Sequence, residues 1–304
     1  MQKITIEEIN ERIINEPDIF ISQCEENYHE SLEVAAERIS SGQGRKLVML
    51  AGPSSSGKTT TASFLKKILT EKGRNAVTVS LDDFYLDQTN APKFPDGRPD
   101  FETVHALDIS KITKCLTSLL EDGRAYFPIF DFNVRKPSDE TKLLEIGEND
   151  VVIVEGLHAL NPLITDPLEK EDMLKLYVSV SSRVFDGENV VFSKRDIRFL
   201  RRMIRDYKFR NSPVDFTFYL WKGVRTGEDK YLFPFSSRAD IKIDSIHPYE
   251  LCVYKKLGEE LLSHIEKDSV YYSRACELRQ KLSLMRSLDT DDVPEDSLLH
   301  EFIG

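Results

Sequence analysis

Apolar residues recur at helical spacing in the first part of the chain. One series is Ile6, Ile9 and Ile13, and a second is Tyr28, Leu32, Ala35, Ala36 and Ile39. We therefore expect residues 1–44 to form a helical extension of net acidic charge. Its mixed apolar face suits docking on the rest of the chain or on a partner, and both interpretations stay open.

From residue 46 onwards, short apolar runs alternate with helical stretches. The runs are residues 46–52 (KLVMLAG), 76–82 (AVTVSLD), 125–130 (AYFPIF), 151–156 (VVIVEG) and 174–180 (LKLYVSV). Helices are expected at 59–72 and 109–122, the latter capped by Asp108 and ended by Gly123. Several runs are apolar on both faces, as in strands covered by helices on both sides. The pattern predicts an α/β fold with a doubly wound, parallel, five-stranded sheet flanked by helices.

Helical patterns return after residue 190 and continue towards the end of the chain. A late amphipathic helix carries Ala275, Leu278, Leu282 and Met285. We expect the acidic stretch 289–296 to be solvated. The apolar side chains of Leu298, Leu299, Phe302 and Ile303 are expected to dock on the fold.

The charge balance limits the classes of partner. The 304 residues include 41 Lys and Arg against 52 Asp and Glu, a net charge of −11, so we expect no nucleic-acid and no membrane partner. No apolar run approaches the roughly 20 residues of a membrane span. The charged N-terminus also lacks the apolar core of a signal peptide, which favours a cytoplasmic protein. A homo-oligomer stays open.

The strongest chemical signal is a G-x-x-x-x-G-K-T motif at residues 52–59. It follows an apolar run and opens a helix, where backbone N–H groups and the helix N-terminus hold phosphates. The expected ATP-binding residues are Gly52, Pro53, Ser54, Ser55, Ser56, Gly57, Lys58, Thr59 and Thr60. Lys58 reaches the β and γ phosphates, and the Thr59 hydroxyl binds Mg²⁺. No N-K-x-D motif follows, which weakens the interpretation as a GTPase.

Two predicted strands end in carboxylates. Asp82 and Asp83 end one strand and Glu155 ends another, at the sheet edge where α/β proteins bind ligands. We expect Asp82 to accept a proton from an attacking hydroxyl or to hold Mg²⁺, and Asp83 to act as a cap. The alternative for Glu155 is a surface glutamate at a strand end.

A basic stretch interrupts the acidic chain. Residues 194–210 carry eight Lys and Arg against two Asp, a local net charge of +6 that leaves −17 for the rest. Four of them, Arg198, Arg201, Arg202 and Arg205, are spaced to form one ridge on a helix. A solvated basic face and an RNA-binding helix are alternatives, but no aromatic stacking platform accompanies it. We expect an arginine-rich helical lid that clamps the transferring phosphate.

Together these segments resemble the uridine kinase and phosphoribulokinase family of P-loop kinases, in particular its uridine kinase-like branch. The resemblance rests on AGPSSSGKTT, SLDDFYLD, DFETVHALD, PIFDF, VVIVEGLHALNP and RFLRRMIRD. It implies a kinase domain at 45–266, between the N-terminal helical extension 1–44 and a C-terminal helix with an acidic tail, 267–304. It also implies transfer of the γ-phosphoryl group of ATP to a primary hydroxyl, with Mg²⁺ and with uridine or cytidine as acceptor.

The resemblance further implies roles for single residues. The catalytic set is Asp82 as base on the sugar hydroxyl, Lys58, Arg201 and Arg205. Arg202 joins the ATP-binding residues, and Thr59 and Glu155 serve Mg²⁺. The acceptor-binding set is Asp82, Tyr85, Glu102, Phe130, Asn133 and Arg210.

Two departures from the family pattern leave the acceptor open. Phe130 stands where uridine kinases carry Tyr, and Asn133 is nearest to the place of a missing base-reading His. One alternative is a kinase for another sugar alcohol, such as a phosphopentose, pantothenate or a purine nucleoside. For a second phosphate, only Arg135 and Lys136 are nearby candidates. The other alternative is a nucleotide-dependent regulatory module without turnover.

Overall fold

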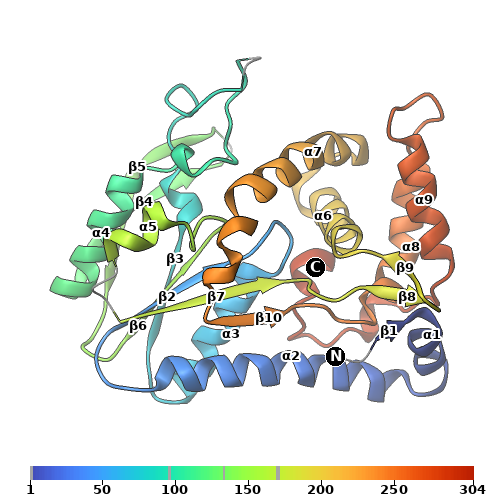
Figure 1. Ribbon diagram of the computed structural model, residues 1–304, viewed down its shortest axis with the longest axis horizontal. Coiled ribbons are helices and arrows are strands. Elements are labelled where there is room, and N and C mark those ends of the chain that lie inside the picture. Colours follow the sequence, from blue (N-terminus) through green and yellow to red (C-terminus); the bar gives the residue numbers. More distant parts are fainter. Residues whose placement is uncertain (1–2, 95–96, 133, 169–171) are drawn as a thin grey trace.

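A five-stranded, all-parallel sheet forms the centre of the computed structural model, which describes residues 3–94, 97–132, 134–168 and 172–304 (Figure 1). The strand order is β10, β7, β2, β6, β3. The bounds are β2 Lys46–Ala51, β3 Ala76–Ser80, β6 Val151–Glu155, β7 Met173–Ser179 and β10 Ile241–Asp244. The predicted α/β fold with five parallel strands is confirmed.

The strands send alternate side chains to two hydrophobic cores. In β2, Val48 and Leu50 join one core, while Leu47 and Met49 join the other. The helices α2 (Pro17–Ser40) and α3 (Lys58–Glu71) cover the first face. The second is covered by α4 (Ile109–Asp122) and α5 (Pro162–Thr165). The fold therefore has three layers, helices, sheet and helices, as expected for strands that are apolar on both faces.

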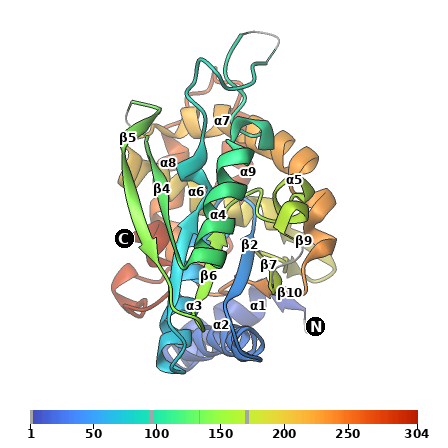
Figure 2. The same cartoon turned by 90° about the vertical axis from the view of Figure 1, so that its left-hand side faces the viewer.

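One strand of the sheet differs from the prediction. Residues 125–130 lie in β4 (Arg124–Asp131), which pairs antiparallel with β5 (Lys136–Glu145) in a separate ribbon (Figure 2). Pro128 lacks an N–H, and the pairing shifts between Pro128 and Phe130, so this segment suits a ribbon better than a central strand. The fifth strand of the sheet is β10, which forms one of its edges. Its sequence, IKID, is too short and too polar to be recognised as a strand.

The N-terminal helices dock on the sheet. After a short strand, β1 (Ile4–Thr5), α1 (Ile6–Asn15) leads into α2, which runs below the sheet in Figure 1. Leu32, Ala36 and Ile39 of α2 are fully buried in the core that holds Val48 of β2. Of the two open interpretations, docking on the rest of the chain is the one that the structure adopts.

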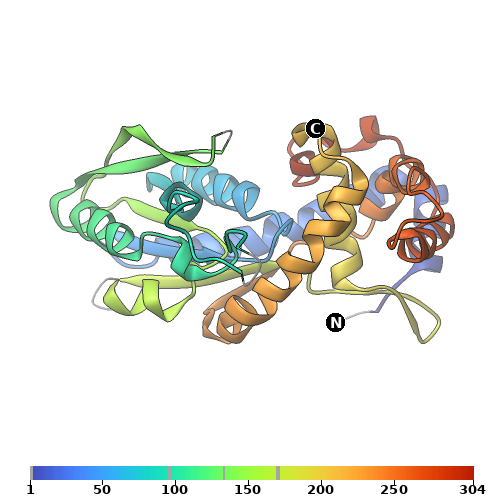
Figure 3. The same cartoon turned by 90° about the horizontal axis from the view of Figure 1, so that it is seen from above.

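The rest of the chain forms a helical part beyond the sheet (Figure 3). It contains β8 (Val184–Asp186), β9 (Asn189–Phe192), α6 (Lys194–Arg210), α7 (Val214–Tyr231), α8 (Glu250–Ser263), α9 (Tyr272–Ser283) and α10 (His300–Ile303). The four predicted docking residues around α10 are buried, and 289–296 is mostly exposed. Within the described ranges, no helix combines the length and apolar character needed to cross a membrane.

Candidate active site

The glycine-rich motif forms the turn between β2 and α3. Gly52 is required sterically, because a Cβ there would lie 2.2 Å from the carbonyl oxygen of Val178. Ser55 and Gly57 have positive φ angles of 57° and 85°, which curl the backbone ahead of α3. Among the described residues, the buried hydroxyls of Ser55 and Ser56 have no hydrogen-bond partner. A phosphate would supply acceptors for such donors.

The motif's polar side chains lie in three different settings. The Lys58 ammonium group donates to the Pro53 carbonyl oxygen at 3.2 Å, so it is folded over the loop. Thr59 is exposed at the start of α3. Thr60, in contrast, donates from both its N–H and its hydroxyl to the carboxylate of Glu301. The sequence gives no sign of this last contact.

The predicted carboxylates lie at the carboxyl edge of the sheet. Glu155 is in register with Ser80 of β3, whose hydroxyl donates to Glu155 Oε1 at 2.7 Å. Burial raises the pKa of the Glu155 carboxyl, with Lys58 opposing the shift and Asp82 adding to it. Glu155, Lys58 and Asp82 therefore form one electrostatic group.

Asp82 lies in a short 3-10 helix, Leu81–Phe84, that follows β3. Its side chain is accessible to solvent but has protein on most sides. This burial raises the pKa of the Asp82 carboxyl, while Lys58 lowers it. The neighbouring Asp83 does not cap this helix, because Ser80 does; Asp83 instead accepts the Phe130 N–H at 3.3 Å and ties the ribbon to the sheet.

An aromatic cavity of about 1040 Å³ includes Tyr85, three residues beyond Asp82, in its lining. Its rings belong to Tyr85, Phe94, Phe101, Phe130, Phe132, Phe216, Phe218, Tyr219, Tyr231 and Tyr271. The Tyr85 ring meets Phe101 and Phe130 edge-on, at centroid distances of 5.5 and 5.8 Å. The predicted acceptor residues Tyr85, Glu102 and Phe130 thus share one cavity, whereas Asn133 lies outside the described residues.

Within the part of the chain that the structure describes, Glu102 is one of two acidic residues that line this cavity, the other being Asp100. Burial raises the pKa of the Glu102 carboxyl to about 7; Arg202 opposes the shift, and the carboxylates of Glu228, Asp100 and Asp82 add to it. Helix α7 packs closely on it, because a Cβ on Gly227 would lie 2.4 Å from Glu102 Cβ. The position of this carboxyl is therefore set by the helix opposite.

The basic helix α6 packs its apolar side into the core, and several of its arginines reach the P-loop. Ile197, Leu200 and Met203 alternate with the arginines and are fully buried. Arg201 is also fully buried, with its Nε 2.6 Å from Glu250 Oε2 and a further bond to the Ser245 carbonyl oxygen. These partners occupy the guanidinium group of Arg201 in this arrangement, so its predicted phosphate contact stays a prediction.

Three further arginines of α6 surround Asp206, and one of them also contacts the P-loop. Arg202, Arg205 and Arg210 all lie within 3.4 Å of Asp206 carboxylate oxygens. Arg202 also donates to the Ser54 hydroxyl at 2.8 Å and lines the cavity. Arg202 therefore lies between the P-loop and the aromatic cavity. The Arg210 side chain is 57% exposed.

Three site features have no counterpart in the sequence prediction. Glu228 of α7 is fully buried, accepts the Ser54 N–H at 2.8 Å and pairs with Arg198. Glu301 reaches Thr60 from the end of the chain. Helix α7 also contributes aromatic and basic side chains to the cavity, and the aromatic run at 216–221 (FTFYLW) was the available signal for it.

About two thirds of this chain is similar to known proteins. Residues 47–251 match the family described as Phosphoribulokinase / Uridine kinase family. A uridine kinase of Lactobacillus helveticus is 27% identical over 196 residues, which span 64% of this chain and 84% of the relative. One of Staphylococcus aureus is 28% identical over 199 residues, 65% of this chain and 86% of the relative. Among solved structures, phosphoribulokinase from Rhodobacter spheroides has a TM-score of 0.43 at 14% identity, covering 66% of this chain and 70% of that one.

Proposed function

The chain belongs to the phosphoribulokinase and uridine kinase family, and from this premise we propose that it transfers the γ-phosphoryl group of ATP to the 5′-hydroxyl of uridine or cytidine. The observation that carries the proposal is the place of Asp82. Its carboxyl interacts electrostatically with Lys58 of the P-loop and with Glu102 of the aromatic cavity. We infer that donor and acceptor meet near this carboxylate, because Asp82 comes three residues before Tyr85, which lines the cavity.

The chain's own residues supply a proton acceptor and positive charge. Asp82 accepts the proton of the attacking hydroxyl, which is made easier by its raised pKa. Lys58, Arg202 and Arg205 offset negative charge on the transferring group. Arg201 supports the P-loop from behind, through its bond to the Ser55 carbonyl oxygen. Catalysis rests on positioning and electrostatics.

The aromatic cavity supports a nucleoside as acceptor. Rings around a cavity of this size offer faces and edges for a nucleobase. In this proposal Glu102 accepts hydrogen bonds from ribose hydroxyls, and Tyr85 and Phe130 contact the base, which their shared place in the cavity lining supports. Arg210 is assigned to the edge of this site on the strength of its interaction with Asp82. Asn133 is retained from the family pattern alone.

The donor set at the sheet edge suits Mg²⁺. Thr59 and Glu155 offer hydroxyl and carboxylate oxygens, and Mg²⁺ prefers few protein oxygens together with substrate phosphates. Where the chain is described, no cluster of three His, Cys, Asp or Glu offers an all-protein site, which fits that preference. The raised pKa of the Glu155 carboxyl, caused by burial, is a second argument, since a cation there would relieve it. When bound, Mg²⁺ neutralises phosphate charge.

A second acceptor class is favoured by the basic side chains of the cavity. Arg98, Arg135, Lys222 and Lys230 line it, besides Arg202. Only Arg135 of these stood out in the sequence. A phosphorylated pentose would place its phosphate against such groups.

The test is ADP release by the purified chain with ATP, Mg²⁺ and a panel of acceptors. The panel holds uridine, cytidine, a purine nucleoside, pantothenate and ribulose 5-phosphate. We expect turnover with the pyrimidine nucleosides. Turnover with ribulose 5-phosphate alone would favour the second class, and ATP binding without turnover on any acceptor would favour a regulatory module.

A further inference from the structure

The C-terminal segment, residues 297–304, lies against the phosphate-binding loop. Leu298 covers Gly57 so closely that a Cβ on Gly57 would lie 2.5 Å from Leu298 Cδ1. The Phe302 ring centroid is 4.9 Å from the Arg201 guanidinium carbon, and Lys208 donates to the Ile303 carbonyl oxygen. The segment is therefore packed onto both the loop and α6.

Glu301 uses hydrogen-bond donors of the helix that follows this loop. Thr60 is the third residue of α3, where backbone N–H groups have no partner within the helix. Its N–H and its hydroxyl both donate to Glu301 Oε2, at 3.4 and 2.6 Å. A carboxylate at a helix N-terminus is stabilised by the same dipole and N–H groups that attract phosphate.

We propose that the Glu301 carboxylate competes with ATP for this helix N-terminus, so that the C-terminal segment restrains nucleotide binding. Two anions held at the same N–H and hydroxyl repel each other, and one hydroxyl hydrogen serves one of them at a time. ATP binding therefore displaces Glu301. The proposal rests on nucleotide binding at the P-loop and not on the identity of the acceptor.

The fold leaves the segment a way to move. Helix α10 has a single turn of four residues, and the mostly exposed stretch 289–296 joins it to the rest of the chain. Moving the segment exposes buried side chains of Leu298, Leu299 and Phe302, so it is displaced only when nucleotide binding supplies the free energy. Its buried apolar side chains favour return to the loop when the nucleotide leaves.

The first test measures the Kd of ATP by calorimetry on the full chain, without acceptor. We expect Glu301→Ala to lower the Kd about tenfold, the effect of losing one charge-assisted hydrogen bond from the closed arrangement. Glu301→Gln, which keeps an acceptor oxygen, should lower it less. Glu295→Gln, an exposed acidic residue of the same tail, is the matched control and should stay within about twofold of the parent chain. An unchanged or raised Kd in Glu301→Ala overturns the proposal.

The second test needs no variant. Hydrogen exchange of the unaltered chain is followed with and without ATP and Mg²⁺. Faster exchange of the amides of residues 298–304 on ATP binding supports displacement; slower or unchanged exchange there overturns it. Neither test measures turnover. If no acceptor in the panel were phosphorylated, the proposed kinase reaction would be rejected, but both tests would still decide whether Glu301 competes with ATP.

Discussion

Asp82 is the residue on which the proposed chemistry depends most directly. Replacement by Asn preserves the size of the side chain and removes the proton acceptor. We expect Asp82→Asn to lower kcat by about 10²- to 10⁴-fold, the range of general-base catalysis. The Kd of ATP should change little. Steady-state kinetics with uridine, together with calorimetry, measures both quantities.

Asp83→Asn is the matched comparison for this substitution. The Asp83 carboxylate accepts the Phe130 N–H and takes no part in proton transfer, so kcat should fall less than tenfold. If Asp82→Asn retained the parent kcat, Asp82 would lose its assignment as the base.

Glu102 predicts a dependence on pH close to neutrality. Burial raises the pKa of its carboxyl to about 7, so the free protein loses the carboxylate as the pH falls through that value. A protonated Glu102 is a poorer acceptor for ribose hydroxyls. We therefore expect kcat/KM for the acceptor to fall as the pH drops below about 7. The inflection should disappear in Glu102→Gln, and persistence of the same profile in that variant would assign it elsewhere.

For single residues, the spacing of the sequence predicted where a side chain lies better than it predicted which residue that side chain contacts. The carboxylates at strand ends could be found because an apolar run delivers each one to the same edge of the sheet. The burial of Arg201 could not, since its partner Glu250 lies 49 residues away and no local pattern joins them. The contact between Thr60 and Glu301 spans 241 residues.

Among the elements, α7 shapes the acceptor cavity through one close contact. Gly227 lets the helix approach Glu102, where a Cβ would lie 2.4 Å from that side chain's own Cβ. We expect Gly227→Ala to move Glu102 and to raise the KM for the acceptor at least several-fold, because small displacements at a binding group weaken catalysis strongly.

Gly223 offers a matched control on the same helix. A Cβ there would meet nothing within 4 Å. Gly223 also lines the cavity, so Gly223→Ala adds a methyl group there without a clash. It should therefore change the KM less than Gly227→Ala does and stabilise the helix by up to about 1 kcal/mol. Equal acceptor KM values for the two variants would show that the contact with Glu102 does not matter for binding.

Helices and strands with a regular hydrophobic pattern could be predicted. The elements whose place depends on contacts with distant parts of the chain could not. Asp108 caps the N-terminus of the helix Ile109–Asp122 and Gly123 ends it, both as predicted. The ribbon strand β4 is as apolar as a sheet strand and was assigned to the sheet, because hydrophobicity does not say which surface a strand covers. The spacing of α6 predicts a lid, and its buried ion pairs could not be predicted for a related reason, since the acids that pair with Arg198 and Arg201 come from α7 and α8.

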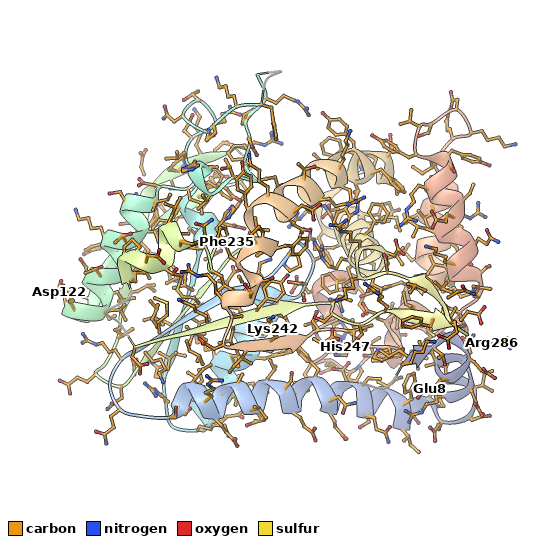
Figure 4. All side chains as sticks on the ribbon, viewed as in Figure 1. Glu8, Asp122, Phe235, Lys242, His247 and Arg286 are labelled. Atoms are coloured by element: carbon orange, nitrogen blue, oxygen red, sulfur yellow. The ribbon has the colours of Figure 1, made fainter. Side chains whose placement is uncertain are left out.

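On the scale of the whole molecule, a buried polar cluster connects both ends of the chain to the sheet. Glu25 of α2 accepts from Ser297 at 2.7 Å and from Tyr249, and lies 3.3 Å from His247 Nε2. His247 lies between α2 and the strand that carries Lys242 (Figure 4). Burying such a cluster is tolerated only where its members satisfy one another, so the N-terminal helix and the tail depend on each other's position.

The N-terminal helices should consequently unfold together with the kinase domain. Leu32 of α2 is fully buried in the core that also holds Trp221, the one tryptophan of the chain. We expect Leu32→Ala to lower the free energy of unfolding by about 2–5 kcal/mol, the cost of a cavity in a packed core. Val34→Ala, at a position that is 63% exposed on the same helix, should cost less than about 0.5 kcal/mol.

Urea unfolding followed by two probes decides whether residues 1–44 unfold together with the rest of the chain. Trp221 reports on the helical part beyond the sheet, and far-ultraviolet circular dichroism reports on all helices, the N-terminal ones included. For a single cooperative unit, Leu32→Ala shifts both curves to the same lower midpoint. If the Trp221 curve kept its midpoint while the dichroism curve gained an early step, residues 1–44 would be a separately unfolding unit. The shared core of Leu32 and Trp221 argues for the first outcome, because a cavity beside α2 then weakens packing that the whole domain relies on.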